Sequence, residues 1–153
     1  MKYSIIENSE TEYKGRTFYQ IQAEETRNGV AKGTIGGFIE STDNLDMSSD
    51  AWITQFSYVG GDVRITNDTL ICGVNHIFNS KDIISLKTED NVITVLKDSV
   101  TGKYKVISSK GKFSNEYDFF VSKVPYDEEK EEMVIAVSAL HDVLLRREAE
   151  NNG

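Results

Sequence analysis

The histidine in residues 73–78 (GVNHIF) is the side chain of this sequence best suited to acid–base chemistry. His76 directly follows Asn75. An imidazole titrates near neutral pH, so it can take a proton from an acceptor hydroxyl or amine. A histidine on an outer face is more often a surface or packing residue. The sequence leaves both roles open for His76.

Other residues that could do chemistry are few and poorly spaced. The chain has two histidines, His76 and His141, and one cysteine, Cys72. Cys72 stands four residues before His76, which is not a zinc-binding spacing. The glycines of residues 33–38 (GTIGGF) lack the Lys-Ser/Thr pair of a phosphate-binding loop. We therefore expect no metal site, no cofactor and no internal disulfide.

The charge balance bears on possible partners. The formal net charge is −8 over 153 residues. A negative surface is unsuited to a phosphate backbone, so direct nucleic-acid binding is not expected; solubility or a basic protein partner explains the excess of acids. No apolar run reaches the ~20 residues of a membrane span, and none resembles a secretory signal. Together with the lone cysteine, this favours a cytoplasmic protein that does not bind membranes.

Residues 43–84 repeat with a period of six, which is the strongest pattern in the chain. Apolar side chains recur in one column of the hexads, at Met47, Ile53, Val59, Ile65, Ile71, Ile77 and Ile83. Small residues such as Ala51 and Ser57 stand two positions before them, and turn-forming glycines and asparagines occupy another column. One long strand does not explain this period, but short strands separated by corners do. The pattern predicts a narrow solenoid with the aliphatic column inside.

These hexads resemble the hexapeptide repeats of left-handed parallel β-helices, in which about three hexads make one coil. The resemblance implies that residues eighteen apart stack: Ile53 with Ile71 and Val59 with Ile77 inside, and Trp52 with Leu70 and Tyr58 with His76 outside. Asp46, Arg64 and Asp82 would form a charge ladder on a solvated face. The family includes acyltransferases with a histidine base near an Asn-His pair, so acyltransferase-like activity at His76 is an alternative. Those enzymes generally carry more coils and a protruding loop, which this sequence lacks.

The flanks of the hexads should close the two ends of so short a solenoid. Two strands are expected over residues 3–7 and 17–23, and a hairpin over 91–96 and 103–107. A short helix should follow over 115–123 with Ser114 as its cap. We expect a single domain over 1–153, made of N-terminal strands with a lead-in segment (1–42), coils (43–84), a hairpin with a short helix (85–124) and a C-terminal helix (125–153).

The last helix, opening at Asp127, has a clear amphipathic pattern. Its apolar side chains share one face at helical spacing: Met133, Val134, Val137, Leu140, Leu144 and Leu145. We expect this face to cover one side of the coils. Pairing with a second copy, giving a homodimer, is the alternative.

A second resemblance extends over nearly the whole chain. Residues 36–40 (GGFIE) with Asn44 and Leu45, ahead of the hexads, are similar to the segment that introduces the coils in small phage and prophage proteins with polymer-forming-type repeats. The fold class is therefore expected to be mostly β (α+β), with a short left-handed β-helix, N-terminal strands, a hairpin and an amphipathic helix. The resemblance implies a phage-type accessory protein, in the cytoplasm of a bacterial host, that binds and inhibits a host protein, as anti-CRISPR-like counter-defence proteins do. A purely structural or oligomerising module is a further alternative.

The outer rows of the predicted coils supply the expected contact residues. Aromatic side chains and arginine are enriched at the centres of interfaces. We therefore predict that Trp52, Tyr58 and Arg64 contact the partner protein. The alternative contact surface is the acidic start of the last helix, at Glu128, Glu129, Glu131 and Glu132.

Overall fold

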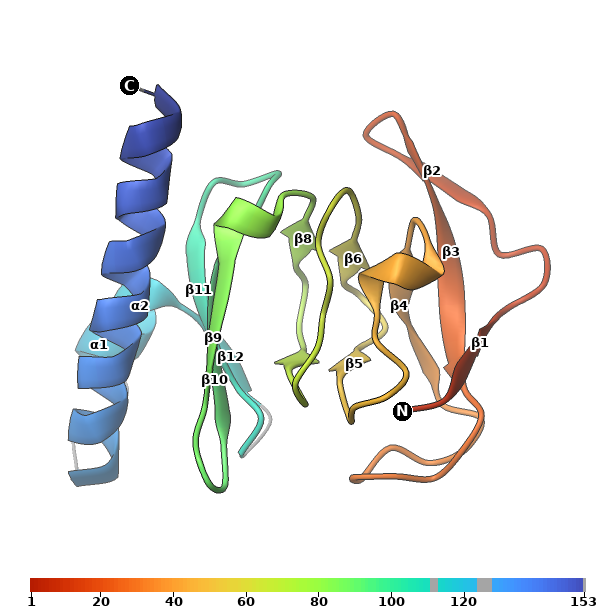
Figure 1. The fold of residues 1–153 in the computed structure, drawn as a ribbon, viewed down its shortest axis with the longest axis horizontal. Coiled ribbons are helices and arrows are strands. Elements are labelled where there is room, and N and C mark those ends of the chain that lie inside the picture. The colour runs from red at the N-terminus through yellow and green to blue at the C-terminus, as the bar shows by residue number, and fades with distance from the viewer. Residues whose placement is uncertain (111–112, 124–127, 153) are drawn as a thin grey trace.

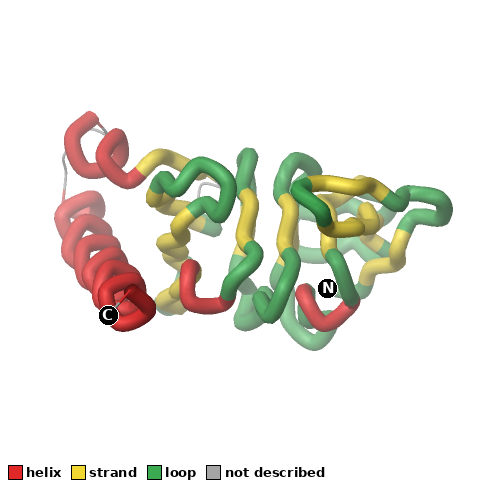
Figure 2. Tube along the Cα trace, turned by 90° about the horizontal axis from the view of Figure 1, so that it is seen from above, coloured by secondary structure: helices red, strands yellow, loops and turns green. Residues whose placement is uncertain are grey.

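A computed structural model describes residues 1–110, 113–123 and 128–152 (Figure 1). The chain is mostly β with one long C-terminal helix, which confirms the α+β class. An N-terminal sheet, a stack of short parallel strands, a second sheet and a helical layer follow one another along the long axis (Figures 1 and 2). None of the helices in the described ranges is long and apolar enough to cross a membrane.

The strands of the described residues form three sheets. One has the order β1-β3-β4-β6-β8, with β2 paired to β3; another has the order β12-β11-β10-β9; and β5 pairs with β7. The elements are β1 (Tyr3–Ile5), β2 (Thr11–Tyr13), β3 (Arg16–Ala23), β4 (Ile35–Ile39), β5 (Trp52–Ile53), β6 (Tyr58–Val59), β7 (Leu70–Ile71), β8 (His76–Ile77), β9 (Ile83–Lys87), β10 (Val92–Lys97), β11 (Tyr104–Ser108), β12 (Phe113–Glu116), α1 (Tyr117–Lys123) and α2 (Glu128–Asn152), with 3-10 turns at Thr42–Asn44 and Ser80–Asp82.

The hexads form short parallel strand pairs with the predicted register. In β5 and β7, Trp52 pairs with Leu70 and Ile53 with Ile71. In β6 and β8, Tyr58 pairs with His76 and Val59 with Ile77. The aliphatic partners Ile53, Val59, Ile71 and Ile77 are fully buried. Stacking at eighteen residues, with these side chains inside, is therefore confirmed.

The described strands belong to three separate sheets, and they do not show the handedness or the continuous coils of a left-handed β-helix. The first hexad is also displaced. Leu45 bridges to Ile65, twenty residues on, so the interval between these two residues is two residues longer than the eighteen of the later pairs. Met47 is consequently exposed, so its predicted inward position was wrong. From Ile83 the chain forms β9, which pairs antiparallel with β10 and ends the repeat.

The predicted charge ladder is only half formed. Arg64 lies 3.4 Å from Asp46. Asp82 instead lies in the turn that contacts α2, where burial raises the pKa of its carboxyl and the charge of Lys97 only partly opposes this. Its expected place above Arg64 was wrong, because the repeat ends one strand earlier.

Both ends of the strand stack are covered by apolar side chains, as expected of the flanks. At one end the core contains Met1, Tyr3 and Ile21 from the N-terminal strands. At the other end Leu96 and Ile107, from the hairpin of β10 and β11, join the same core. The predicted N-terminal strands and hairpin are confirmed, and β2, β4, β9 and β12 are additional strands.

The helices pack on the second sheet (β9 to β12) and not on the stack of short parallel strands (β5 to β8). A separate apolar cluster joins Ile93, Val95 and Val106 of β10 and β11 to Phe120, Val137, Leu140 and Leu144. The expectation that the last helix covers a face of the coils was therefore wrong: side chains alternate along β10, so the sheet has a second apolar face that needs burial. Leu145 is 43% exposed, against prediction. Ser114 lies within β12 and caps no helix, and Asp127 lies outside the described residues.

Candidate functional site

A groove of about 750 Å³ lies beside β5 and β7. We call it the Trp52 groove. Its apolar lining includes Val30, Trp52, Leu70, Cys72 and Val92. The loop 28–30 borders it on one side and the turn between β9 and β10 borders it on the other. Both segments lie at the lower edge of Figure 1.

The side chain of Trp52 is held in place by the backbone of β4, which lies close to its ring. Its side chain is nearly buried, and its ring packs against Gly36 of β4. A Cβ atom at Gly36 would lie 2.7 Å from the Trp52 ring and 2.9 Å from the carbonyl oxygen of Ile53, which is closer than real contacts allow. Gly36 thus serves packing, because only a residue without a side chain lets β4 lie against Trp52.

The chain's lone thiol lines the same groove. Cys72 follows β7 and is nearly buried. Burial raises the pKa of the Cys72 thiol, so the thiolate that would act as a nucleophile is disfavoured. Cys72 therefore contributes shape and an apolar surface to the groove.

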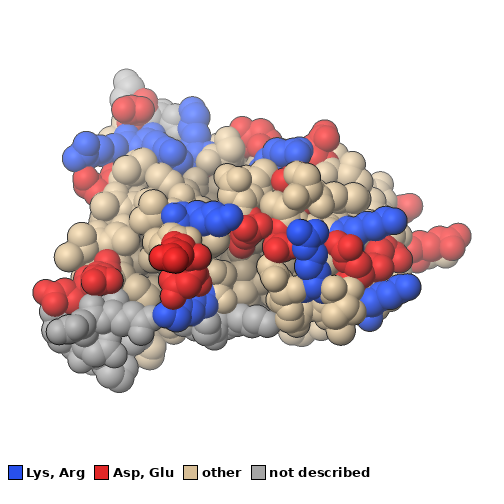
Figure 3. All heavy atoms as spheres, turned by 60° about the horizontal axis from the view of Figure 1, so that its bottom comes forward, with Lys and Arg blue, Asp and Glu red and all other residues tan. Residues whose placement is uncertain are grey.

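A chain of ion pairs forms the rim of the groove. Arg27 Nε lies 2.5 Å from Asp50 Oδ1, and Lys87 Nζ lies 2.6 Å from Asp68 Oδ2. The backbone N–H of Asp50 donates to Asp68 Oδ1 at 2.8 Å, which links the two pairs. The Lys87 ammonium, followed by the Asp50 N–H, lowers the pKa of Asp68. Figure 3, with the bottom of Figure 1 turned forward, shows acidic and basic side chains interspersed across this side of the molecule.

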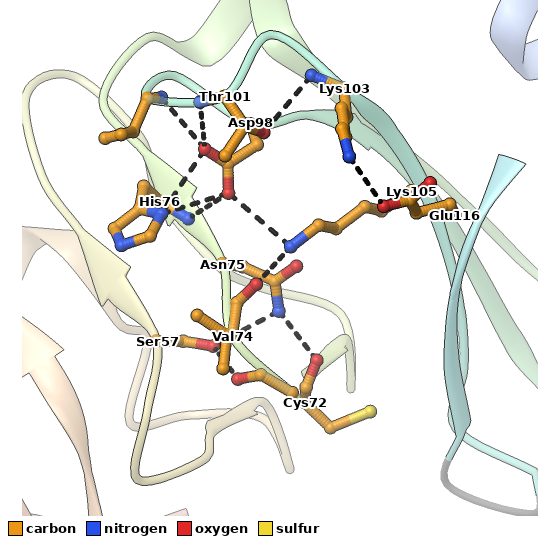
Figure 4. Close-up of polar contacts among 12 residues, drawn as sticks. Ser57, Cys72, Val74, Asn75, His76, Asp98, Thr101, Lys103, Lys105 and Glu116 are labelled. Carbon is orange, nitrogen blue, oxygen red and sulfur yellow. Dashed lines mark hydrogen bonds and ion pairs between the residues drawn. The ribbon is translucent and has the colours of Figure 1, made fainter.

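The predicted base, His76, lies in a different and closed environment (Figure 4). Its Nδ1 is 3.0 Å from Asp98 Oδ2, and its Nε2 is 3.2 Å from the hydroxyl of Tyr13. The Tyr13 ring stacks on His76 with a centroid separation of 5.2 Å. Both ring nitrogens are thus in contact with protein groups, and only 11% of the side chain is exposed. A substrate would have to displace Tyr13 to reach Nε2.

Asp98 organises this buried cluster. Its carboxylate is fully buried and accepts the backbone N–H groups of His76, Val100 and Thr101. Burial alone would raise its pKa, but the N–H groups of Thr101 and Val100, together with the His76 ring, outweigh burial and lower the pKa. Lys105 Nζ lies 3.6 Å away. Asp98 therefore remains ionised, and it accepts the backbone N–H of His76 in β8.

The Asn-His pair does not form a joint site. Asn75 is fully buried, and its Nδ2 donates to Ser57 Oγ and to the carbonyl oxygen of Cys72. Its Oδ1 accepts no hydrogen bond from the described residues. Asn75 thus belongs to the interior, whereas His76 faces Tyr13 and Asp98 on the outside. The arrangement of the cluster is that of a structural, buried hydrogen-bond network.

The structure separates the three predicted contact residues. Trp52 lines the groove. Tyr58 is half-buried between Phe38 and Tyr13, with ring centroids 4.5 Å and 4.7 Å away. Arg64 is exposed and borders a smaller recess beside Ile83 and Ile84. The alternative residues Glu131 and Glu132 are exposed on α2, while the side chains of Glu128 and Glu129 lie outside the described set.

Sequence reasoning did not find the residues that complete either site. The role of Asp98 in its own turn could be predicted locally, because an Asp side chain often accepts hydrogen bonds from the backbone N–H groups that follow it in a turn. The contact of Asp98 with His76, twenty-two residues away, could not be predicted locally. Asp50 and Asp68 stand eighteen residues apart, so the stacking register could have paired them on the rim.

A group of three or more His, Cys, Asp or Glu side chains that could hold a metal ion is not found among the described residues. In comparisons with known proteins, the chain matches no protein-family model and no curated protein sequence.

Proposed function

We propose that the chain is a binding protein that takes part of another protein into the Trp52 groove, in the manner of phage accessory proteins that bind and inhibit a host protein. The observation that carries the proposal is the groove itself. It is open, about 750 Å³ in volume, and combines the chain's only tryptophan with a charged rim. Apolar grooves with an aromatic anchor and a polar border are typical of protein interfaces.

The enzymatic alternative has less support. An acyltransferase needs an accessible base next to a place for its substrate. His76 is held by Asp98 and Tyr13 and does not line the groove. A base in this position could act only after the hairpin of β2 and β3 had moved away.

The remaining parts of the proposal come from the resemblance to phage proteins. We propose that the parallel pairs are a short left-handed β-helix, with support from their eighteen-residue register. We also propose that the host target is a bacterial cytoplasmic protein, such as a component of a defence system. A homodimer through α2 stays a secondary prediction, with Ile135 and Leu145 exposed on that helix.

The test is affinity capture from a bacterial lysate with two matched variants. Thr54→Tyr puts a bulky side chain into the Trp52 groove, and Thr66→Tyr puts the same side chain into the recess beside Arg64. Both are first checked for an unchanged thermal melt. We expect the parent and Thr66→Tyr to retain one stoichiometric partner that Thr54→Tyr loses. Equal capture by both variants would reject the groove as the binding surface.

A further inference from the structure

We propose that the Trp52 groove recognises a lysine or arginine side chain of the partner protein, and that Lys87 occupies the place of that cation in the free protein. The inference rests on the proposed function and names the chemistry of its partner. The cation would pair with Asp68, and its aliphatic stem would lie on Leu70. The groove would thus read a basic residue within an otherwise apolar segment.

The lining of the groove has an excess of negative charge. It contains the acids Asp50, Asp68, Glu89 and Asp90 and the single base Lys87. Arg27 and Lys110 pair with Asp50 and Asp90 from outside the lining, and the acids still outnumber the bases. The whole chain has a formal charge of −8. Both the local and the overall field therefore favour a positively charged partner.

Asp68 is the acid best placed to exchange its cation. Asn67 and Asp68 have positive φ angles of 53° and 62° and form a tight corner. The N–H of Asp50 donates to one carboxylate oxygen and fixes its direction, while the other oxygen faces Lys87. The carboxylate is thus preorganised for a cation, which reduces the entropic cost of binding one.

Lys87 is held much less firmly than the carboxylate. Its side chain is 56% exposed and stands near the end of β9, where the chain turns towards β10. An exposed pair of this kind contributes little net stability, because solvent competes for both charges. A cation from a partner comes with apolar contacts between the partner and the groove. These contacts favour binding of the partner, so its cation can replace Lys87 on Asp68.

This arrangement makes an unusual prediction about Lys87. If Lys87 contacts an acidic group of the partner, its removal weakens binding. If Lys87 stands in for the partner's cation, its removal frees Asp68 and strengthens binding. The two possibilities predict opposite signs for one substitution.

The experiment uses the full chain and two capped pentapeptides, Ala-Leu-Lys-Leu-Ala and its glutamate counterpart Ala-Leu-Glu-Leu-Ala. Occupancy is followed by selective excitation of Trp52, the chain's only tryptophan, which lines the groove. We expect the lysine peptide to bind at least about tenfold more tightly than the glutamate peptide, because the contact with Asp68 is attractive for one and repulsive for the other. Lys87→Met should tighten binding of the lysine peptide by about threefold or more, and Asp68→Asn should weaken it.

Lys103→Met is the matched control, because the Lys103 side chain is about as exposed as that of Lys87 and pairs with Glu116 away from the groove. It should leave the affinity unchanged. The inference is overturned if Lys87→Met weakens binding, if the two peptides bind alike, or if neither perturbs Trp52 at millimolar concentration. Capture with Thr54→Tyr decides the proposed function separately, so a groove without charge preference would leave that function standing.

Discussion

At the scale of residues, position in the hexad decides whether a side chain is structural or available. Ile71 points into the stack and is fully buried, whereas its neighbour Leu70 lines the groove. His76 carries the chemistry that the sequence singles out, but Asp98 and Tyr13 engage both of its ring nitrogens. The reactivity of a side chain such as His76 is therefore limited by the residues that contact it.

Truncating an inward aliphatic residue should destabilise the fold strongly. Ile71→Ala removes buried methyl groups and leaves a cavity in a stack with little room to relax, so we expect a loss of about 2–5 kcal/mol in the free energy of unfolding. Ile135→Ala is the matched control, because Ile135 is 68% exposed, and should cost no more than about 0.5 kcal/mol. Urea unfolding measures both. Similar midpoints for the two variants would contradict the inward assignment.

Asp98 should give a defined pH dependence of stability. Its pKa is lowered in the folded state, so the carboxylate stabilises the fold above the unfolded-state pKa of about 3.9. This contribution is lost as the pH falls through the lower folded-state value. Asp98→Asn should therefore cost about 1–3 kcal/mol near neutral pH, and the gap to the parent should shrink below about pH 4.

The comparison of the parent with Asp98→Asn isolates this carboxylate, since the other acids are common to both proteins. Urea unfolding at several pH values gives the gap directly. A gap that stays constant down to the acid limit, or widens there, would show that Asp98 is not held ionised in the fold.

At the scale of elements, the sequence predicts strands and helices well where their residue types repeat at a regular spacing. The six-residue period correctly predicts the strand pairs Trp52–Leu70 and Tyr58–His76. It fails at Met47 and Asp82, because Leu45 and not Met47 bridges to Ile65, and because β9 leaves the stack. The groove was not predicted, because loop 28–30 and the turn after β9 come together only through tertiary packing. Helical periodicity likewise identified the apolar face of α2 but not the sheet that covers it.

Two adjacent leucines of α2 test where that helix packs. Leu144 is nearly buried against the second sheet, whereas Leu145 is 43% exposed. Leu144→Ala should lower the free energy of unfolding by about 2–4 kcal/mol, and Leu145→Ala by less than about 1 kcal/mol. Thermal or urea unfolding distinguishes them. The reverse order would place the helix on a different face.

At the scale of the whole molecule, the chain is an acidic body with a groove on one side. Residues of the strand stack and of the second sheet both line the groove. Because the groove spans both, its shape depends on how the hairpin of β10 and β11 packs on the stack. The net charge of −8 adds a long-range attraction for basic partners.

This charge should make association with the partner depend on salt. The association rate should fall several-fold as the ionic strength rises, since salt screens charges separated by more than about 10 Å at 0.1 M. The dissociation rate should change much less. Stopped-flow mixing at a series of salt concentrations measures both rates. An association rate that is independent of salt, or that rises with it, would argue against a basic partner.

The alkylation rate of Cys72 tests binding at the groove most directly. Cys72 is the chain's only thiol and lines the groove, so the parent protein reports occupancy without substitution. Partner binding should slow the reaction several-fold. A control thiol at position 74, made as Cys72→Ala with Val74→Cys, should react at an unchanged rate, because Val74 is 57% exposed and outside the groove. A stable complex in which Cys72 reacts as fast as in the free protein would contradict binding in the Trp52 groove.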